Sequence, residues 1–162
     1  MKNTSIIYLV IITLSALLSS PLYAGGINID MVVQKVVQTK GANGNTTIEH
    51  VPADITVPGD VVIYTTTYHN EGDKPADKVS IVNVIPKEVR LITDSLKGNA
   101  AVTYSVDDGV KFDSPENLHI ITEAQASRLA TADDYTHLRW FIITLTAGKA
   151  GEVSFQARIR EN

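Results

Sequence analysis

The chain has 162 residues, 44% of them hydrophobic, with 14 Lys and Arg against 18 Asp and Glu, a formal net charge of −4 and no cysteine. The absence of cysteine excludes a disulfide framework, a thiolate metal site and a lipid attached through a cysteine. The acidic balance argues against nucleic acid or an anionic membrane surface as a partner, because both attract basic proteins.

The first residues have the layout of a secretory signal peptide. Lys2 supplies a positive charge, Ile6 to Leu18 are all apolar or hydroxyl-bearing, and Ala24 is a small residue at a suitable cleavage point. The alternative is an uncleaved membrane anchor, but the apolar run is shorter than the roughly 20 residues that a spanning helix needs. We therefore predict that residues 1–24 are removed on export and that residues 25–162 form a single domain.

The beginning of this domain predicts extended strands joined by turns. Ile27 to Thr39 is rich in β-branched residues, which polar residues interrupt at irregular steps, so we expect a strand with a bulge or kink. Lys40 to Thr47 holds glycines and asparagines typical of a turn. Ile48 to Val51 follows as a short strand, and Val57 to Asp60 as a further turn.

Two clearer strands flank the polar segment His69–Asp77. Alternation places four residues of the first strand on one face: Val62, Tyr64, Thr66 and Tyr68. It does the same in the second strand, which Pro86 ends: Val79, Ile81, Asn83 and Ile85. The polar segment is predicted to be a turn in which Asn70 and Gly72 favour positive φ. The turn does not require His69 and Glu71, which are left open to contact a partner.

Shorter strands are predicted at Glu88–Ile92, Ala101–Val106 and Asn117–Ile121, with Asp107–Gly109 as a hairpin turn. Thr122–Asp133 breaks the pattern and is predicted to be a surface connection with at most one helical turn. Two longer strands complete the domain: Thr136–Leu145 and Gly151–Arg160, the latter with Val153, Phe155, Ala157 and Ile159 facing inward. Many short strands without a long helix predict an all-β fold, an antiparallel β-sandwich of about seven strands.

Metal sites have little support in the residue spacing. The four histidines lack ligand spacing and a cysteine to assist them, so partly exposed strand histidines are the simpler interpretation: His50, His69, His119 and His137. Two acidic groups resemble calcium-binding loops in their oxygen content: Asp107, Asp108 and Asp113, and the pair Asp133 and Asp134. We favour turn chemistry over calcium, because Asp-Gly is common hairpin chemistry and alternating ligand spacing is absent.

Catalytic motifs are not recognisable in the sequence, which has no Gly-x-Ser-x-Gly elbow and no phosphate-binding glycine loop. We predict no catalytic, cofactor-binding or metal-binding residue, and no enzymatic activity. Trp140 shares a strand face with Leu138 and Ile142, so a core position is favoured over a sugar-stacking platform. The arginines of the last two strands are interpreted as a solvated face and not as a patch for an acidic partner: Arg139, Arg158 and Arg160.

The order of these motifs resembles a bacterial conserved-repeat family known as domain of unknown function eleven. The resemblance covers residues 55–160 and rests on matching positions from one strand to the next: Gly59, Asp60, Tyr64, Asn70, Gly72, Val79, Ile81, Ile85 and Pro86. It continues through Thr103–Phe112 and Asp134–Ile159. Asn83 departs from the pattern, since family members often have Asp there. The resemblance implies an immunoglobulin-like sandwich in an exported or cell-surface protein, without enzymatic activity.

These observations predict an exported, non-catalytic structural or interaction module of the bacterial cell envelope. Its expected location is the periplasm, with secretion or the cell surface as the alternative, because no apolar anchor follows Arg158. The expected partner is another envelope protein, bound through loops or by a strand added at an open sheet edge. The alternative function is an ion- or ligand-binding domain for calcium or carbohydrate.

Overall fold

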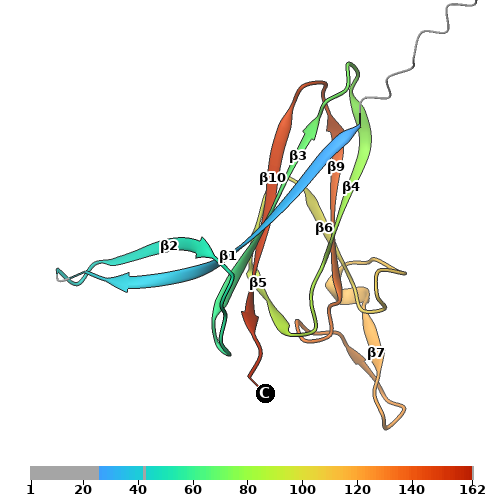
Figure 1. The fold of residues 1–162 in the computed structure, drawn as a ribbon. Coiled ribbons are helices and arrows are strands. Elements are labelled where there is room, and N and C mark those ends of the chain that lie inside the picture. Colours follow the sequence, from blue (N-terminus) through green and yellow to red (C-terminus); the bar gives the residue numbers. More distant parts are fainter. Residues whose placement is uncertain (1–25, 42, 162) are drawn as a thin grey trace, which may run out of the picture.

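A computed structural model describes residues 26–41 and 43–161, so the predicted signal peptide, residues 1–24, lies outside the described residues. Within these ranges the chain forms ten strands and one short 3-10 segment, η1 (Pro115–Asn117). Figure 1 shows the strands as an elongated sandwich-like body from which two hairpins project. The prediction of an all-β protein is therefore confirmed. None of the described residues belongs to a helix that is long and apolar enough to cross a membrane.

The strands form two main antiparallel sheets and a small hairpin. The larger sheet has the order β2-β1-β3-β10-β5 and the smaller one has the order β4-β9-β6, while β7 pairs only with β8. The larger sheet consists of β2 (Thr46–Pro52), β1 (Ile27–Lys40), β3 (Val61–Asn70), β10 (Ala150–Ile159) and β5 (Val89–Lys97). The remaining strands are β4 (Ala76–Val84), β9 (His137–Leu145), β6 (Ala101–Ser105), β7 (His119–Ile121) and β8 (Ser127–Leu129).

The prediction of about seven strands was too low, and the interpretation of Thr122–Asp133 as a surface connection was wrong in part. Within that segment, β8 pairs with β7, and the turn between them is closed by a hydrogen bond from the Thr122 N–H to the Ala126 carbonyl at 2.9 Å. Gln125 makes this tight turn possible by adopting a φ of 60°. The local hairpin chemistry therefore prevails over the alanine-rich composition.

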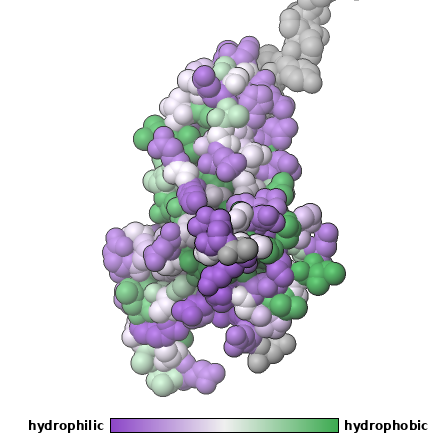
Figure 2. Space-filling model, turned by 90° about the vertical axis from the view of Figure 1, so that its left-hand side faces the viewer, coloured by the Kyte–Doolittle hydropathy of each residue, from purple (hydrophilic) through white to green (hydrophobic). Residues whose placement is uncertain are grey.

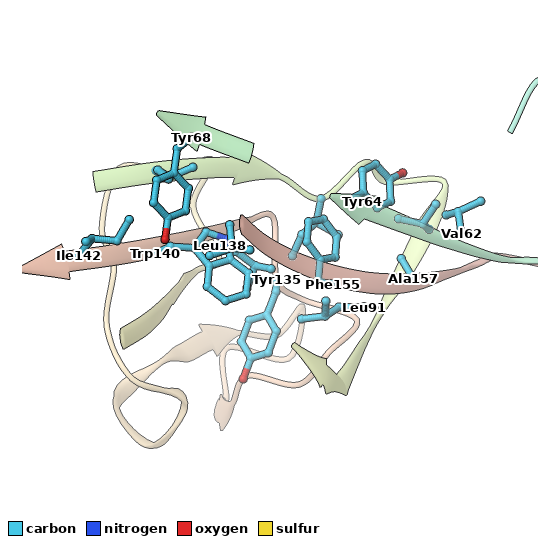
Figure 3. Packing of buried hydrophobic residues seen from close by; sticks show 14 of the residues in the cluster. Val62, Tyr64, Tyr68, Leu91, Tyr135, Leu138, Trp140, Ile142, Phe155 and Ala157 are labelled. Carbon is cyan, nitrogen blue, oxygen red and sulfur yellow. The ribbon is translucent and has the colours of Figure 1, made fainter. Parts of the chain in front are cut away.

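Alternating side chains of the two sheets meet in one core. The residues predicted to face inward from the third and fourth strands are mostly buried, and Tyr64 stacks on Phe155 of β10 with ring centroids 4.7 Å apart (Figure 3). Trp140 is 1% exposed at the centre of this core, which confirms its predicted core position. Ser154, predicted to face outward, is instead buried at an irregularity in the pairing of β10 with β5.

A buried polar link joins the two sheets within this core. The indole Nε1 of Trp140 on β9 donates to Asn83 Oδ1 on β4 at 2.8 Å, and Asn83 Nδ2 donates to Thr66 Oγ1 on β3 at 2.8 Å. Thr66 belongs to the larger sheet, whereas Asn83 and Trp140 belong to the smaller one. A buried amide is costly unless it is hydrogen-bonded, so this link favours one lateral position, with β4 over β3.

The other projecting element is an arm formed by β2 and the second half of β1. Residues Ile27–Val36 of β1 pair with β3, whereas Gln34–Lys40 pair with β2 beyond the body of the sandwich. Six of the seven residues of β2 are exposed. Figure 2 views the molecule from the side on which this arm projects, and hydrophilic residues there surround smaller groups of hydrophobic ones. Neither face of the arm is covered by the second sheet.

Candidate functional site

The polar segment His69–Asp77 is a structural turn built around Asn70, which is 1% exposed. Its Oδ1 accepts the Gly72 N–H at 3.0 Å, and its Nδ2 donates to the Lys74 carbonyl at 2.8 Å. The predicted turn is confirmed, but its predicted backbone is wrong, because neither Asn70 nor Gly72 has positive φ. The Asn70 side chain makes the contacts that hold the turn, so a left-handed residue is not required.

The same amide connects this turn to the opposite sheet. Asn70 Nδ2 also donates to the Leu145 carbonyl at the end of β9 at 2.9 Å. The backbone N–H of Asn70 donates to the Lys149 carbonyl, and the Gly148 N–H donates to the Asn70 carbonyl, both at 2.9 Å. Asn70 thus joins the β3–β4 turn to the β9–β10 turn at one end of the sandwich, and its chemistry is used within the fold.

His69 and Glu71, which the sequence left open to a partner, contact each other and β1. His69 Nδ1 lies 4.0 Å from Glu71 Oε1, and Asn28 Nδ2 donates to the same oxygen at 3.0 Å. Both side chains are about half exposed. Across the described residues, histidine and the acidic residues nowhere form a group of three or more that would hold a metal ion.

The acidic residues near Gly109 act as turn caps. Asp107 accepts the Ser105 hydroxyl at 2.7 Å and the Lys111 N–H at 2.9 Å, while Asp108 has a φ of 57°. The backbone bond from Lys111, with the Ser105 hydroxyl second, lowers the pKa of Asp107. Asp113 instead accepts hydrogen bonds from residues that follow it, Asn117 at 2.9 Å and Ser114 at 2.8 Å. These contacts fit the turn interpretation.

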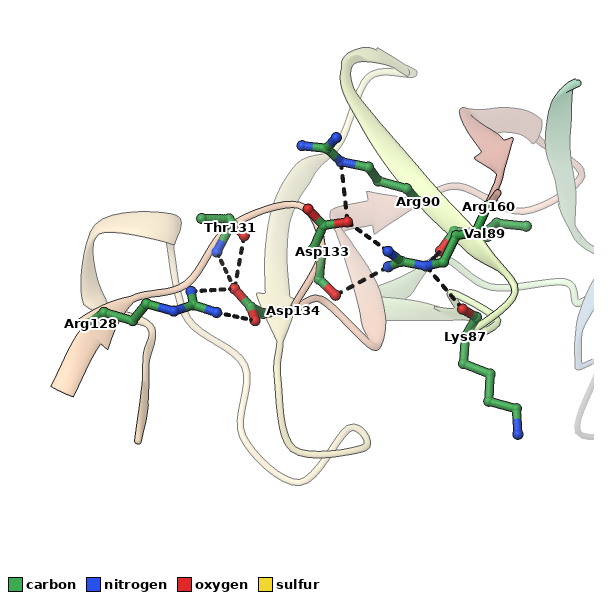
Figure 4. A network of polar contacts seen from close by, with 8 residues as sticks. All are labelled: Lys87, Val89, Arg90, Arg128, Thr131, Asp133, Asp134 and Arg160. Carbon is green, nitrogen blue, oxygen red and sulfur yellow. Dashed lines mark hydrogen bonds and ion pairs between the residues drawn. The ribbon is translucent and has the colours of Figure 1, made fainter. Parts of the chain in front are cut away.

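Asp133 and Asp134 are paired with arginines (Figure 4). Asp133 Oδ1 accepts Arg160 Nη1 at 2.7 Å and lies 3.3 Å from Arg90 Nε. Asp134 forms a two-pronged pair with Arg128, with contacts of 2.7 and 2.8 Å, and also accepts the Thr131 N–H. The Arg128 guanidinium, helped by the Thr131 bonds, holds the pKa of Asp134 well below its usual range. These carboxylates therefore connect the segment before β9 to its neighbours.

Replacing Asp134 with asparagine is expected to destabilise the protein by about 1–2 kcal/mol at neutral pH, because a charge-assisted pair is lost. The pKa of Asp134 is lower in the folded than in the unfolded state, so its ionisation contributes stability above the ordinary pKa of about 4. That contribution declines as the pH falls from about 5 through the folded pKa. Urea unfolding at pH 7 and pH 3 should show a smaller difference between wild type and Asp134→Asn at pH 3. A difference that grows with acidity would contradict the pairing.

The arginines predicted to line a solvated face do not form one patch. Arg139 Nε donates to Thr103 Oγ1 at 3.1 Å, and its guanidinium lies 4.5 Å from the centroid of the Phe112 ring. Arg158 Nη1 donates to the Gly59 carbonyl at 2.8 Å, and Arg160 belongs to the Asp133 contacts. Each arginine is engaged locally.

A different feature, which the sequence analysis did not identify, lies along one long side of the sandwich. β4 is an edge strand of the smaller sheet, so its outer edge has no neighbouring strand within the described residues. Below it, β1 places alternate residues on the core-facing side of the larger sheet, because Ile29 pairs with Tyr68 and Met31 with Thr66. Yet Ile29 is 49% exposed and Met31 is 51% exposed. We call β4's outer edge together with Ile29 and Met31 the lateral groove.

The exposure of Ile29 and Met31 has a simple geometric cause. Asn83 of β4 contacts Thr66 of β3, and its Nδ2 also lies 3.7 Å from the sulfur of Met31 on β1. β4 therefore lies over β3 and contacts β1 only at its margin. The smaller sheet would need one more strand to cover β1. The opposite long side is different, because Gly98, with a φ of 136°, brings the β5–β6 connection tightly against β10. A side chain there would lie 2.7 Å from Val153.

Comparisons with protein families, with curated proteins and with solved structures found no match for this chain. The resemblance to the conserved-repeat family therefore stays a prediction. The groove offers backbone hydrogen-bonding groups beside an apolar row, and this is the combination that a sheet edge needs to bind an extended peptide.

Proposed function

We propose that the protein is an exported, non-catalytic interaction domain of the bacterial cell envelope that binds an extended segment of another polypeptide in the lateral groove. The observation that carries this proposal is the exposure of Ile29 and Met31 on the core-facing side of β1, next to the free edge of β4. An added strand would hydrogen-bond to β4 through its backbone and place alternate side chains on this apolar row. Backbone pairing supplies affinity, and the apolar row supplies specificity.

The export part of the proposal rests on the amino-terminal pattern of Lys2, the apolar run and Ala24. The periplasm is the proposed compartment. The immunoglobulin-like character is proposed from the motif resemblance, and the packing of two antiparallel sheets around one core is consistent with it. Domains of this architecture commonly act through binding surfaces, but the groove is the argument for binding here, since fold alone does not define function.

Capture of a partner from the periplasmic and surface fractions would test this function. We expect the wild-type protein to recover a stoichiometric partner and Ile29→Asp to lose it, because a charge in the groove opposes an apolar strand. Val32→Asp is the matched control, since Val32 is also 49% exposed on β1 but points to the other face of the sheet. Equal recovery by both variants, or no stoichiometric partner for the wild type, would overturn the proposal.

A further inference from the structure

We propose that the segment bound in the lateral groove is the arm of a second copy of this chain, with β2 of one molecule added to the free edge of β4 in the next. This inference rests on the proposed function and names the partner of the same site. The donor and the acceptor are different surfaces of one chain, so the contact is head-to-tail. Such a contact produces rings or linear chains of molecules instead of a closed pair.

The arm has the properties of a donor strand. β2 pairs only with β1, and its outer edge is open within the described residues. Ile48, near its centre, is 60% exposed, and a two-stranded hairpin gains little stability without a further surface to cover it. In Figure 1 the arm extends to the left of the sandwich, whereas β4 runs along its right-hand side. The arm therefore points away from the groove of its own chain and is available to another.

The acceptor edge is close to the arm in length. Lys78 has a φ of 56°, which interrupts the extended backbone near the start of β4, so the regular edge runs from Val79 to Val84. Lysine and local distortion are ordinary protections of an edge strand, and here they leave most of the strand unprotected. This edge has six residues, one fewer than the seven of β2. A donated strand of that length would extend the smaller sheet across the exposed part of β1.

The side-chain pattern favours an antiparallel pairing with Ile48 opposite Ile81. Ile48 would then cover the apolar row of Ile29 and Met31, because alternate residues of β4 face the core. Glu49 would lie on the outer face opposite Ser80 and diagonal to Lys78, within the reach of long side chains. Both the apolar and the charged contacts are thus complementary between the arm and the edge.

Complementation between two variants tests this inference. Sedimentation velocity of the purified full chain over a range of concentrations should show wild-type assembly that grows with concentration. Ile48→Asp damages only the donor, and Ile29→Asp damages only the acceptor, so each variant alone should assemble more than about tenfold more weakly. Mixing them should restore one contact, between the intact arm of one variant and the intact groove of the other. The mixture should therefore form a one-to-one dimer and stop there.

Matched variants sharpen the outcome. Val32→Asp, on the other face of β1, should assemble as the wild type does. Glu49→Lys and Lys78→Glu should each weaken assembly about two- to fivefold, and the double variant should recover most of that loss. A wild-type chain that stays monomeric at all concentrations would overturn the inference. A mixture of the two variants that stays monomeric would also overturn the inference. The head-to-tail contact predicts complementation, whereas a symmetric pairing of two β4 edges does not. If the chain stays monomeric but still captures an envelope protein through Ile29, the proposed function holds and only this inference fails.

Discussion

Replacing Trp140 with alanine is expected to lower the free energy of unfolding by about 3–5 kcal/mol, the cost of removing a large aromatic side chain from a packed core. Trp140 is 1% exposed, and its indole also donates a hydrogen bond to Asn83, whose own bond to Thr66 links the two sheets. A loss of this size is a large part of the total stability of a small domain. Urea denaturation followed by circular dichroism would measure it, and a loss below about 1 kcal/mol would contradict the packing described.

Two milder substitutions separate the packing of Trp140 from its hydrogen bond. Trp140→Phe keeps an aromatic ring but leaves Asn83 Oδ1 without its indole donor, at an expected cost of about 1–3 kcal/mol beyond any packing change. Removing the amide as well, in Trp140→Phe combined with Asn83→Leu, should cost less than the sum of the two single losses. Additive losses would show that the buried link contributes no coupling between β4 and β9.

Asn70→Ala is expected to destabilise the protein by about 2–4 kcal/mol, because several hydrogen bonds of one buried amide are lost together. The substitution removes the bonds to the Lys74 and Leu145 carbonyls and to the Gly72 N–H. It leaves the Leu145 carbonyl without this donor in a buried setting. Thermal and urea unfolding would both report the change as an earlier transition.

Asn70→Asp identifies which half of the amide matters. Aspartate preserves the acceptor for Gly72 but places a carboxylate oxygen beside the two carbonyls that Asn70 Nδ2 now binds. We therefore expect Asn70→Asp to be as harmful as alanine at neutral pH, and less harmful in acid, where the carboxyl group can donate. Asn28→Ala is the control, because its bond to Glu71 is exposed and should be worth less than about 0.5 kcal/mol. Full stability of Asn70→Asp at neutral pH would contradict the assigned amide orientation.

Alternation in the sequence predicted the core faces well, since period-two patterns depend only on local backbone geometry. It placed Asn83 among the inward residues of its strand but could not show why an amide is tolerated there. The partners of Asn83, Thr66 and Trp140, lie 17 and 57 residues away in the sequence. A buried polar group is explained by tertiary contacts, and no local pattern contains them. Asn70 was assigned a backbone role for the same reason, because its contact with Leu145 spans 75 residues.

The lateral groove could not be predicted from the sequence, for a different reason. The residues of β1 have a strand composition, but whether Ile29 and Met31 are covered depends on how many strands the opposite sheet contains. The acidic residues near Gly109 were predicted correctly as turn residues from their local chemistry, whereas the arginines that pair with Asp133 come from strands distant in the sequence. Thr122–Asp133 was misjudged because its hairpin depends on a left-handed Gln125, a residue type that gives little warning of that conformation.

The position of β10 inside the larger sheet has a consequence for the timing of folding. β10 lies between β3 and β5, with Phe155 opposite Tyr64 and Ala157 opposite both Val62 and Leu91. During synthesis, the larger sheet cannot form completely before the ribosome has passed residue 159. Until then β3 and β5 lack β10, the strand that pairs with both. A chain whose paired strands are far apart in the sequence folds slowly. On the proposed export route, that delay would keep the polypeptide unfolded long enough to pass through a secretion channel.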